Sequence, residues 1–297
     1  MALDSMEEIF EKMEGGKKPF WQVVLDTDVE ERQVTAEASF EKMRTNWRAM
    51  LEAVDTYRGE RRSVSGLVGG DGQRMAEYRE KGETLSGDYL SEVIQTALCT
   101  GESNACMRKI VAAPTAGACG VLPAVLVPLY QEGRAGEEEI VEALYVSAGI
   151  GAVIGYRASI AGASGGCQAE IGSASAMAAG ALTALRGGEP EEIGHAVAMA
   201  LKNLMGLICD PVAGLVEVPC VKRNVIGAVN AVSVADMAMA GITSRIPVDE
   251  VIYAMGEVGR RMPVEFRETA LGGLAVTPTG TAIQEHMRKS PEVAYDS

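Results

Sequence analysis

Three cysteines, each in a turn marked by glycine or proline, are the residues of this chain best suited to hold a metal centre. Cys167 follows a glycine pair, Cys209 precedes an Asp-Pro dipeptide and Cys220 follows a proline, at spacings of 42 and 11 residues. A structural zinc site or a fully protein-ligated iron–sulfur cluster takes four ligands. Three thiolates leave one metal position open for a substrate, which is what a catalytic cluster needs. Zinc is an alternative without a fourth ligand nearby, and three ordinary buried thiols are another.

The sequence around the cysteines predicts how each is presented. Cys167 is expected at the entry to a helix over 168–187, where free backbone N–H groups would lower the pKa of its thiol. Cys209 is expected at the end of a helix over 190–208, because the residue before a proline disfavours helical geometry. The loop between Cys209 and Cys220 would bring both sulfurs to one edge of a cluster.

Two glycine-containing loops are candidates for cradling a substrate carboxylate, because glycines let backbone amides approach an anion closely. They are PTAGACG (114–120), with Thr115 and Gly117, and GASGG (162–166), with Ser164 and Gly165. The alternative is that both are tight turns between helices. A third glycine-rich stretch, SGLVGGDG (65–72), is interpreted as an ordinary turn rather than an anion-binding loop.

Polar residues near the cysteines are the remaining candidates. Lys202 and Lys222 are proposed as catalytic cations and Asn203 as a substrate-binding group, although they could instead pair with the acidic surface. The same alternatives apply to Arg223 and Asn224. The other polar residues and cysteines have mainly structural interpretations. Glu217 is an orienting group, Glu170 a helix-dipole partner, His195 a packing residue, His286 a solvated one, Cys99 and Cys119 space-filling thiols, and Cys106 has no assigned role.

Composition restricts the class of protein. The chain has 297 residues and a net charge of −14, which argues against nucleic acid or an anionic membrane as a main partner. Residues 1–20 lack the apolar region of a signal peptide, and no stretch is predicted to span a membrane. Without a predicted signal peptide or membrane span, a cytoplasmic location is expected. Six cysteines in that compartment are more often ligands or buried thiols than disulfides.

Helices are the elements expected to position these groups, because the apolar residues recur with helical periodicity. The predicted fold class is therefore all-α. Strand-like alternation is weak, apolar residues are small or aliphatic, and only 5% of residues are aromatic, which favours closely packed helices. Residues 1–80 are predicted as a charged helical extension with a polar stretch at 58–72, and 81–297 as the catalytic helical domain. Helices are expected at 6–15, 35–57, 88–100, 121–131, 137–156, 168–187, 190–208, 224–241 and 248–259.

Three motifs in order, PTAGACGVLPAVL (114–126), GASGGCQAEIGSASAMAAG (162–180) and CDPVAGLVEVPCVKRN (209–224), resemble the alpha subunit of bacterial iron–sulfur-dependent L-serine dehydratase, over about residues 85–285. The resemblance implies a 4Fe–4S cluster on Cys167, Cys209 and Cys220, and water elimination from L-serine to give pyruvate and ammonia. It also implies a beta subunit in a hetero-oligomer, since this chain lacks the Ser-Ser-His-Thr-type motif of single-chain relatives.

Several alternatives stay open beside this resemblance. A related cluster lyase would act on threonine or cysteine, since a methyl group changes binding by only about 1–3 kcal/mol. A non-catalytic iron–sulfur sensor would bind metal without turnover, and an apo helical scaffold would bind none. Some relatives end in a cysteine that caps the open iron, whereas this chain ends AYDS, so such capping is not expected; the Ser297 carboxylate is a weak substitute.

Overall fold

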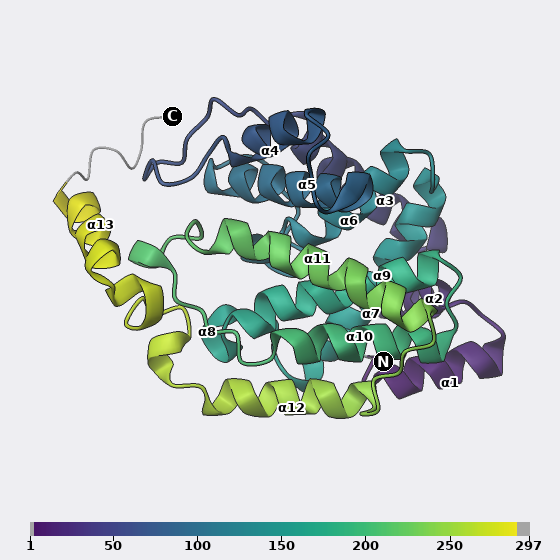
Figure 1. The fold of residues 1–297 in the computed structure, drawn as a ribbon. Helices are drawn as coiled ribbons and strands as arrows, with labels where there is room; N and C mark the ends of the chain where they lie inside the picture. Colours follow the sequence, from purple (N-terminus) through teal and green to yellow (C-terminus); the bar gives the residue numbers. More distant parts are fainter. Residues whose placement is uncertain (1–2, 290–297) are drawn as a thin grey trace.

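The computed structural model describes residues 3–289, which form a bundle of helices around a central helix (Figure 1). The α helices are α1 (Met6–Gly16), α2 (Phe20–Arg32), α3 (Ala36–Asp55), α4 (Asp71–Glu80), α5 (Gly87–Ala105), α6 (Val121–Gln131), α7 (Glu137–Arg157), α8 (Gly162–Gly165), α9 (Ser173–Leu185), α10 (Pro190–Leu204), α11 (Cys220–Met239), α12 (Val248–Arg261) and α13 (Pro278–Lys289). Short turns are η1 (Ala116–Ala118), the π turn η2 (Gln168–Gly172), η3 (Val212–Gly214), η4 (Val264–Phe266) and η5 (Gly273–Val276). Within residues 3–289 the one β pairing outside helices is a bridge between Cys209 and Arg267, so the all-α prediction is confirmed.

Local sequence signals fix where the predicted helices begin. At α10, Pro190 occupies the first turn and the Glu192 carboxylate accepts the Glu189 backbone N–H at 2.8 Å. The predicted end of this helix at residue 208 is wrong, because the helix stops at Leu204. The chain leaves the helix direction at Gly206, whose φ of +87° lies in the left-handed region that favours glycine. The Gly206 N–H donates to Gln168 Oε1 at 2.8 Å. Helices α2, α4 and α13 were not predicted.

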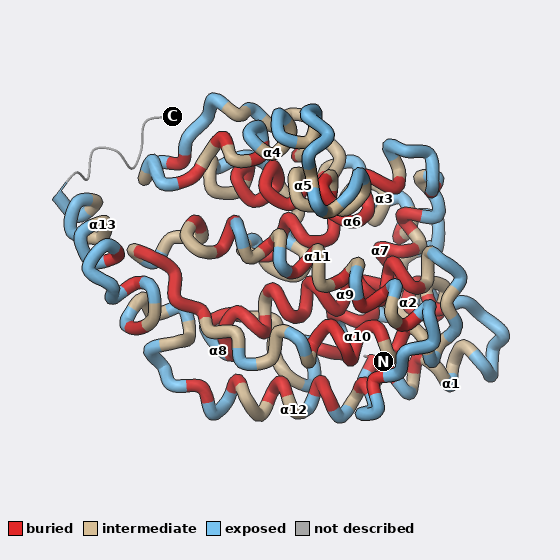
Figure 2. Tube along the Cα trace, viewed as in Figure 1, coloured by how far each residue is buried: buried red, intermediate tan, exposed pale blue. Residues whose placement is uncertain are grey.

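The centre of the core is α9, which packs against α7, α10 and α11. Figure 2 shows this region as the most continuously buried part of the trace. The helix is rich in alanine, serine and glycine, so its neighbours approach closely. A Cβ at Gly180 would stand 2.2 Å from Ile150 Cδ1, and Ser175 Oγ donates to the Gly227 carbonyl at 2.7 Å. The expectation of small residues at helix crossings is confirmed.

Residues 3–80 share the main core with the rest of the described chain rather than forming one of their own. Trp47 of α3 is fully buried and meets Tyr130 of α6 edge-to-face at 5.5 Å between ring centroids. Phe40 stacks on Tyr145 of α7 at 6.0 Å. The predicted boundary at residue 80 therefore does not divide the hydrophobic core.

By length and composition alone, α7 is the one helix in residues 3–289 that would suit a membrane span. Of its apolar stretch, 61% is buried inside the protein. Its apolar side chains face α9, α2 and α3. This is weak evidence for a span, since a buried core helix has the same composition.

Candidate functional site

Three different backbone settings present the three cysteines. Cys167 lies between α8 and the π turn η2, and the next N–H, of Gln168, donates to the Leu207 carbonyl at 2.9 Å. Cys209 is extended, because its N–H donates to the Phe266 carbonyl at 2.8 Å and its carbonyl accepts from Glu268 at 2.9 Å. Cys220 is the first residue of α11. Interruptions of helices by π turns occur often at functional sites.

The three thiols converge on one another although they are far apart in sequence. All are buried, with exposed fractions of 2% for Cys167, 2% for Cys209 and 8% for Cys220. The Cys209 sulfur lies close enough to the other two for ionisation of either one to raise its pKa. In residues 3–289, however, no three His, Cys, Asp or Glu side chains are close enough to ligate a single metal ion. The arrangement therefore lacks the close ligand set that zinc requires.

Burial, rather than a helix N-terminus, dominates the chemistry of these thiols. Burial raises the pKa of Cys167 to about 11, although Arg223 and the Ile171 N–H oppose it. Burial likewise raises the pKa of Cys220 to about 12 and raises the pKa of Cys209. The prediction of a lowered pKa for Cys167 is wrong, because desolvation outweighs the backbone donor. A bound cation would be needed to hold the three as thiolates.

A buried ion pair anchors the segment that carries Cys209. Arg223 Nη2 lies 2.8 Å from Asp210 Oδ1, with side chains 12% and 3% exposed. Arg223 Nη1 also donates to the Ile208 carbonyl at 2.8 Å, and Asp210 Oδ2 accepts the Leu274 N–H at 2.8 Å. The guanidinium thus joins α11 to both residues that flank Cys209 and lies beside Cys167.

Glu170 is the carboxylate that faces this group, a placement that its interpretation as a helix-dipole partner missed. A Cβ at Gly162 would stand 2.8 Å from Glu170 Oε2 and 3.2 Å from Cys209 Sγ, so the missing side chain leaves room for both. A Cβ at Gly117 would be 3.5 Å from each Glu170 oxygen. Burial raises the pKa of Glu170, the Thr115 hydroxyl opposes the rise and Glu268 adds to it.

The loop with Thr115 and Gly117 closes the other side of the site. Asn224 Nδ2 donates to the carbonyls of Gly117 at 2.8 Å and Cys220 at 3.0 Å, and Asn224 Oδ1 accepts the Gly120 N–H at 2.8 Å. Thr115 Oγ1 is buried beside Glu170, whose pKa it lowers, and it makes no hydrogen bond within the described residues. The two predicted substrate-binding residues of this loop thus lie near the cysteines.

The other predicted site residues are engaged elsewhere. Lys202 Nζ donates to the Ser244 carbonyl at 2.7 Å, and Lys222 pairs with Asp71 at 3.1 Å with its side chain 74% exposed. Asn203 Nδ2 donates to Asn230 Oδ1 at 2.7 Å. None of these contacts involves the cysteines.

Ser164 and Gly165 line a small cavity between α8 and α12 instead of facing Glu170. A Cβ at Gly259 of α12 would stand 2.9 Å from Gly165 Cα, so Gly165 and Gly259 allow α8 and α12 to pack closely. The tight-turn alternative describes this part of the GASGG loop, whereas its first glycine, Gly162, faces the cysteines.

Two carboxylates tie the polar stretch at 58–72 to the rest of the protein. Glu217, three residues before Cys220, accepts hydrogen bonds from Ser63 at 2.8 Å and from Ser65. Glu102 is 1% exposed and accepts the N–H groups of Asp71 at 2.8 Å and Gly72 at 3.2 Å. The stretch is a connection between helices, as predicted, and the anion at the N-terminus of α4 is a carboxylate of the chain itself.

The remaining histidines and cysteines lie outside the site. His195 Nδ1 accepts the Ser244 N–H at 3.4 Å, and His286 is exposed on α13. Cys99 and Cys119 are buried, as expected of space-filling thiols, and Cys106 is partly exposed. Ser297, suggested as a weak cap for an open iron, lies outside the described residues.

Comparison with known proteins gives a consistent set of relatives. The family model "Serine dehydratase alpha chain" matches residues 16–275, well before the predicted start at about residue 85. The chain is 47% identical over 263 residues to a "Probable L-serine dehydratase, alpha chain" of Bacillus subtilis, covering 89% of this chain and 88% of the relative. It is 48% identical over 223 residues to the "L-serine dehydratase, alpha chain" of Peptoniphilus asaccharolyticus, covering 75% and 76%. With the "L-serine dehydratase TdcG" of Escherichia coli it shares 46% identity over 182 residues, covering 61% of this chain but 40% of that protein.

Proposed function

This chain belongs to the serine dehydratase alpha-chain family, and from that premise we propose that it is the alpha subunit of an L-serine dehydratase. The reaction eliminates water from L-serine and yields pyruvate and ammonia after tautomerisation and hydrolysis of the aminoacrylate. The observation that carries the proposal is the convergence of Cys167, Cys209 and Cys220 beside Glu170.

We propose a 4Fe–4S cluster as the cofactor, held by these three cysteines. The donor set fits in its chemistry, because thiolates are the ligands of iron–sulfur clusters and the three cysteines are buried near one another. The buried thiols require a cation to ionise, and the unpartnered Thr115 hydroxyl is available to a ligand. When bound, a cluster with one iron free of protein ligands supplies a Lewis acid for the departing hydroxyl of serine.

The residues of the chain would contribute binding and proton transfer. Thr115 and the amides near Gly117 would contact the polar groups of serine. Glu170, whose pKa burial raises, is the proposed acceptor of the Cα proton at Oε2. Arg223 would hold the Cys209 segment in place through Asp210. Lys202 and Lys222, whose ammonium groups are engaged by Ser244 and Asp71, receive no role in this scheme.

We further propose that a separate beta chain completes the enzyme in a hetero-oligomer. Support comes from the alpha-chain names of the relatives and from the match to only 40% of the Escherichia coli protein. A cytoplasmic location is proposed as well, in keeping with the six free cysteines.

Anaerobic reconstitution with iron and sulfide tests the proposal. The measurements are iron and sulfide content, charge-transfer absorbance, and pyruvate formed from L-serine, with and without the beta chain. Cys167→Ser should lose both iron and turnover, whereas the matched change Cys99→Ser, at a buried thiol of α5 outside the site, should retain both. Absence of iron from the wild-type protein would contradict the cluster, and iron without turnover in the presence of the beta chain would favour a sensor.

Glu170→Gln gives a separate test of the proton acceptor. The amide cannot take a proton from Cα, so turnover should fall by about 10²–10⁴-fold. Iron content should stay at the wild-type level because no ligand is altered. Unchanged turnover would assign the base to another group, including one on the beta chain. Comparing L-threonine and L-cysteine with L-serine in the same assay decides the substrate.

A further inference from the structure

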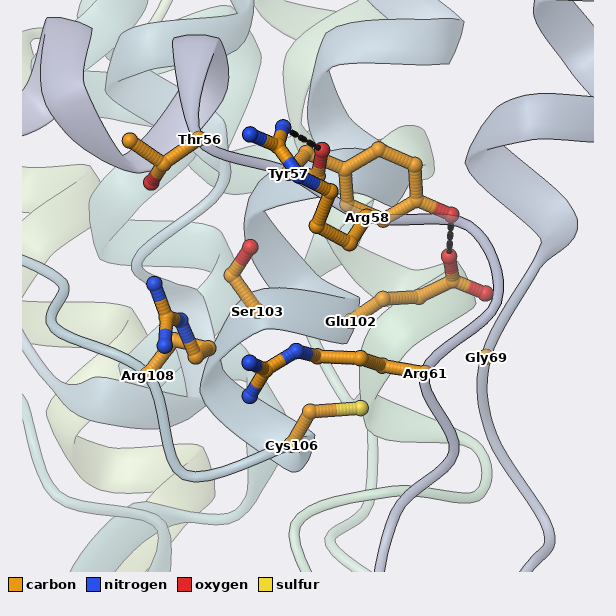
Figure 3. A pocket seen from close by; sticks show the side chains of 9 residues that line it. All are labelled: Thr56, Tyr57, Arg58, Arg61, Gly69, Glu102, Ser103, Cys106 and Arg108. Carbon is orange, nitrogen blue, oxygen red and sulfur yellow. Dashed lines mark hydrogen bonds between the residues drawn. The ribbon is translucent and has the colours of Figure 1, made fainter.

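Four arginines without acidic partners gather where α3 ends and α5 ends. Arg58, Arg61 and Arg62 follow α3, and Arg108 follows α5. All four are exposed, and within residues 3–289 no carboxylate lies within 4.0 Å of any of their guanidinium groups, although the chain carries a net charge of −14. Figure 3 shows the guanidinium groups of Arg61 and Arg108 turned toward one space beside Cys106.

The carboxylates nearest to these arginines are already committed. Glu102 accepts two backbone N–H groups and the Tyr57 hydroxyl, and Glu217 accepts Ser63 and Ser65. The charge of Arg108 contributes to a lowered pKa of Glu52, but the ion pair of Glu52 is with Lys109 at 2.8 Å. The cationic charge of the four arginines is therefore left for a group outside the chain.

The form of this surface favours a protein over a small ligand. The cavity among Arg58, Arg61 and Arg108 is only about 10 Å³, whereas small-molecule pockets enclose about 300–1,000 Å³. Met107 stands between Cys106 and Arg108 with 84% of its surface exposed. Arginine and methionine are both enriched in protein interfaces. The net charge of −14 opposes a polyanion such as nucleic acid.

This surface is connected to the candidate active site by two short paths. The residue after Arg62 is Ser63, which binds Glu217, three residues before Cys220. The Asn104 side chain, in the last turn of α5, donates to the Ala116 carbonyl at 3.2 Å, next to Thr115. The arginines are therefore linked, through Ser63 and Asn104, to loops that line the site.

We propose that Arg58, Arg61, Arg62, Met107 and Arg108, called here the arginine surface, dock the beta chain through carboxylates on that chain. The inference rests on the proposed function, because the occupant is the second chain of the same enzyme. The part of the longer Escherichia coli relative that lies outside the match supplies the candidate, since the match covers 40% of that protein. Electrostatic complementarity of this kind sets partner choice and association rate.

The test measures the affinity of this chain for its own beta chain. That beta chain is the protein, encoded in the same genome, that resembles the part of the longer relatives to which this chain does not align. The double variant Arg61→Glu/Arg108→Glu should weaken the Kd at least tenfold and reduce its salt dependence. Arg261→Glu is the single-reversal control, with its side chain 83% exposed on α12, which Figure 1 places on the opposite side of the bundle from α4 and α5. Arg61→Glu alone is matched to it in charge and should weaken binding about threefold or more, whereas Arg261→Glu should leave the Kd unchanged.

A second readout locates the contact. Cys106 is partly exposed beside the arginine surface, so bound beta chain should slow its reaction with a maleimide in the wild-type protein. Thermal unfolding of the Arg61 and Arg108 variants, expected to be unchanged because these two arginines have no acidic partner among residues 3–289, establishes that the fold is intact.

Four outcomes would overturn the proposal. They are unchanged affinity in the double variant, absence of Cys106 protection, no binding of the beta chain by the wild-type protein, and self-association of this chain that the double variant abolishes. Failure of the proposed function is distinguishable, because a beta chain that binds at the arginine surface without serine turnover leaves the docking surface intact and removes the activity.

Discussion

Replacing Gly162 by alanine should disable the site while leaving the fold almost intact. The added Cβ would lie 2.8 Å from Glu170 Oε2 and 3.2 Å from Cys209 Sγ, where ordinary contacts begin at 3.4 Å. The carboxylate must therefore retreat by about 0.6 Å and the sulfur by about 0.2 Å, as the differences from 3.4 Å require. The backbone at Gly162 does not have a positive φ, so the effect arises from space and not from conformation.

The cost in stability is modest because two effects oppose each other. Overpacking a close-packed site costs about 1–3 kcal/mol, and alanine in place of a helical glycine contributes about 0.5–1 kcal/mol in the other direction. We expect the free energy of unfolding to fall by about 0–2.5 kcal/mol. Displacement of a catalytic group by a fraction of an ångström to 1 Å lowers turnover by up to about 10²-fold, so kcat/KM for L-serine should fall by more than tenfold.

The assay compares Gly162→Ala with Gly155→Ala in the reconstituted two-chain enzyme. Gly155 is an exposed helical glycine of α7, and its Cβ would meet Ile160 Cγ2 at an ordinary 3.8 Å. The control should match the wild type in kcat/KM and in iron content. If Gly162→Ala keeps kcat/KM within threefold of the wild type, the placement of Glu170 and Cys209 around Gly162 is not the reactive geometry.

Three further predictions concern buried charges and thiols. Arg223→Met should lower the free energy of urea unfolding by about 3–5 kcal/mol, because it leaves the Asp210 carboxylate buried without its partner. The control Arg260→Met breaks a more exposed pair and should cost less than about 1 kcal/mol. Equal losses in the two variants would contradict the burial argument. Glu102→Gln should cost about 1.5–3 kcal/mol, because an amide cannot accept both backbone N–H groups of α4 and the Tyr57 hydroxyl as a carboxylate does, and an unchanged urea midpoint would refute this. Burial raises the pKa of Cys119 from 9.0 to about 12, so its contribution to stability is complete below pH 9 and is lost as pH rises toward 12, at up to about 1.4 kcal/mol per pH unit. Cys119→Ala should therefore show a shallower decline in unfolding free energy between pH 9 and 11, and parallel slopes would contradict a raised pKa.

The sequence by itself determined the all-α class, the start of α10 and the group of cysteines. Helix starts depend on neighbours in sequence, and the proline and glutamates after Glu189 placed the start of α10 correctly. The all-α class followed from periodicity in the same way. The cysteines stood out because each lies in a turn, and the structure places all three in one buried region.

Only the tertiary structure decided which polar residues share that region. Lys222 is nearer to Cys220 in sequence than Arg223 is, and Lys202 also precedes a cysteine closely. Their ammonium groups nevertheless bind Asp71 and Ser244, and of the three cations only Arg223 reaches Asp210 and Cys167. The side of a helix on which a residue projects and the neighbour that packs there are set by non-local contacts, which sequence spacing does not encode.

The same reason explains the pKa of Cys167 and the role of Gly162. A helix entry predicts a lowered thiol pKa, but burial in the folded chain, where Cys167 is 2% exposed, raises it although Arg223 opposes the rise. In the sequence Gly162 is one glycine of a candidate substrate-binding loop or tight turn, and its value lies in the space it leaves for Glu170 and Cys209. Desolvation and packing volume are properties of the assembled core, so only the folded chain fixes them.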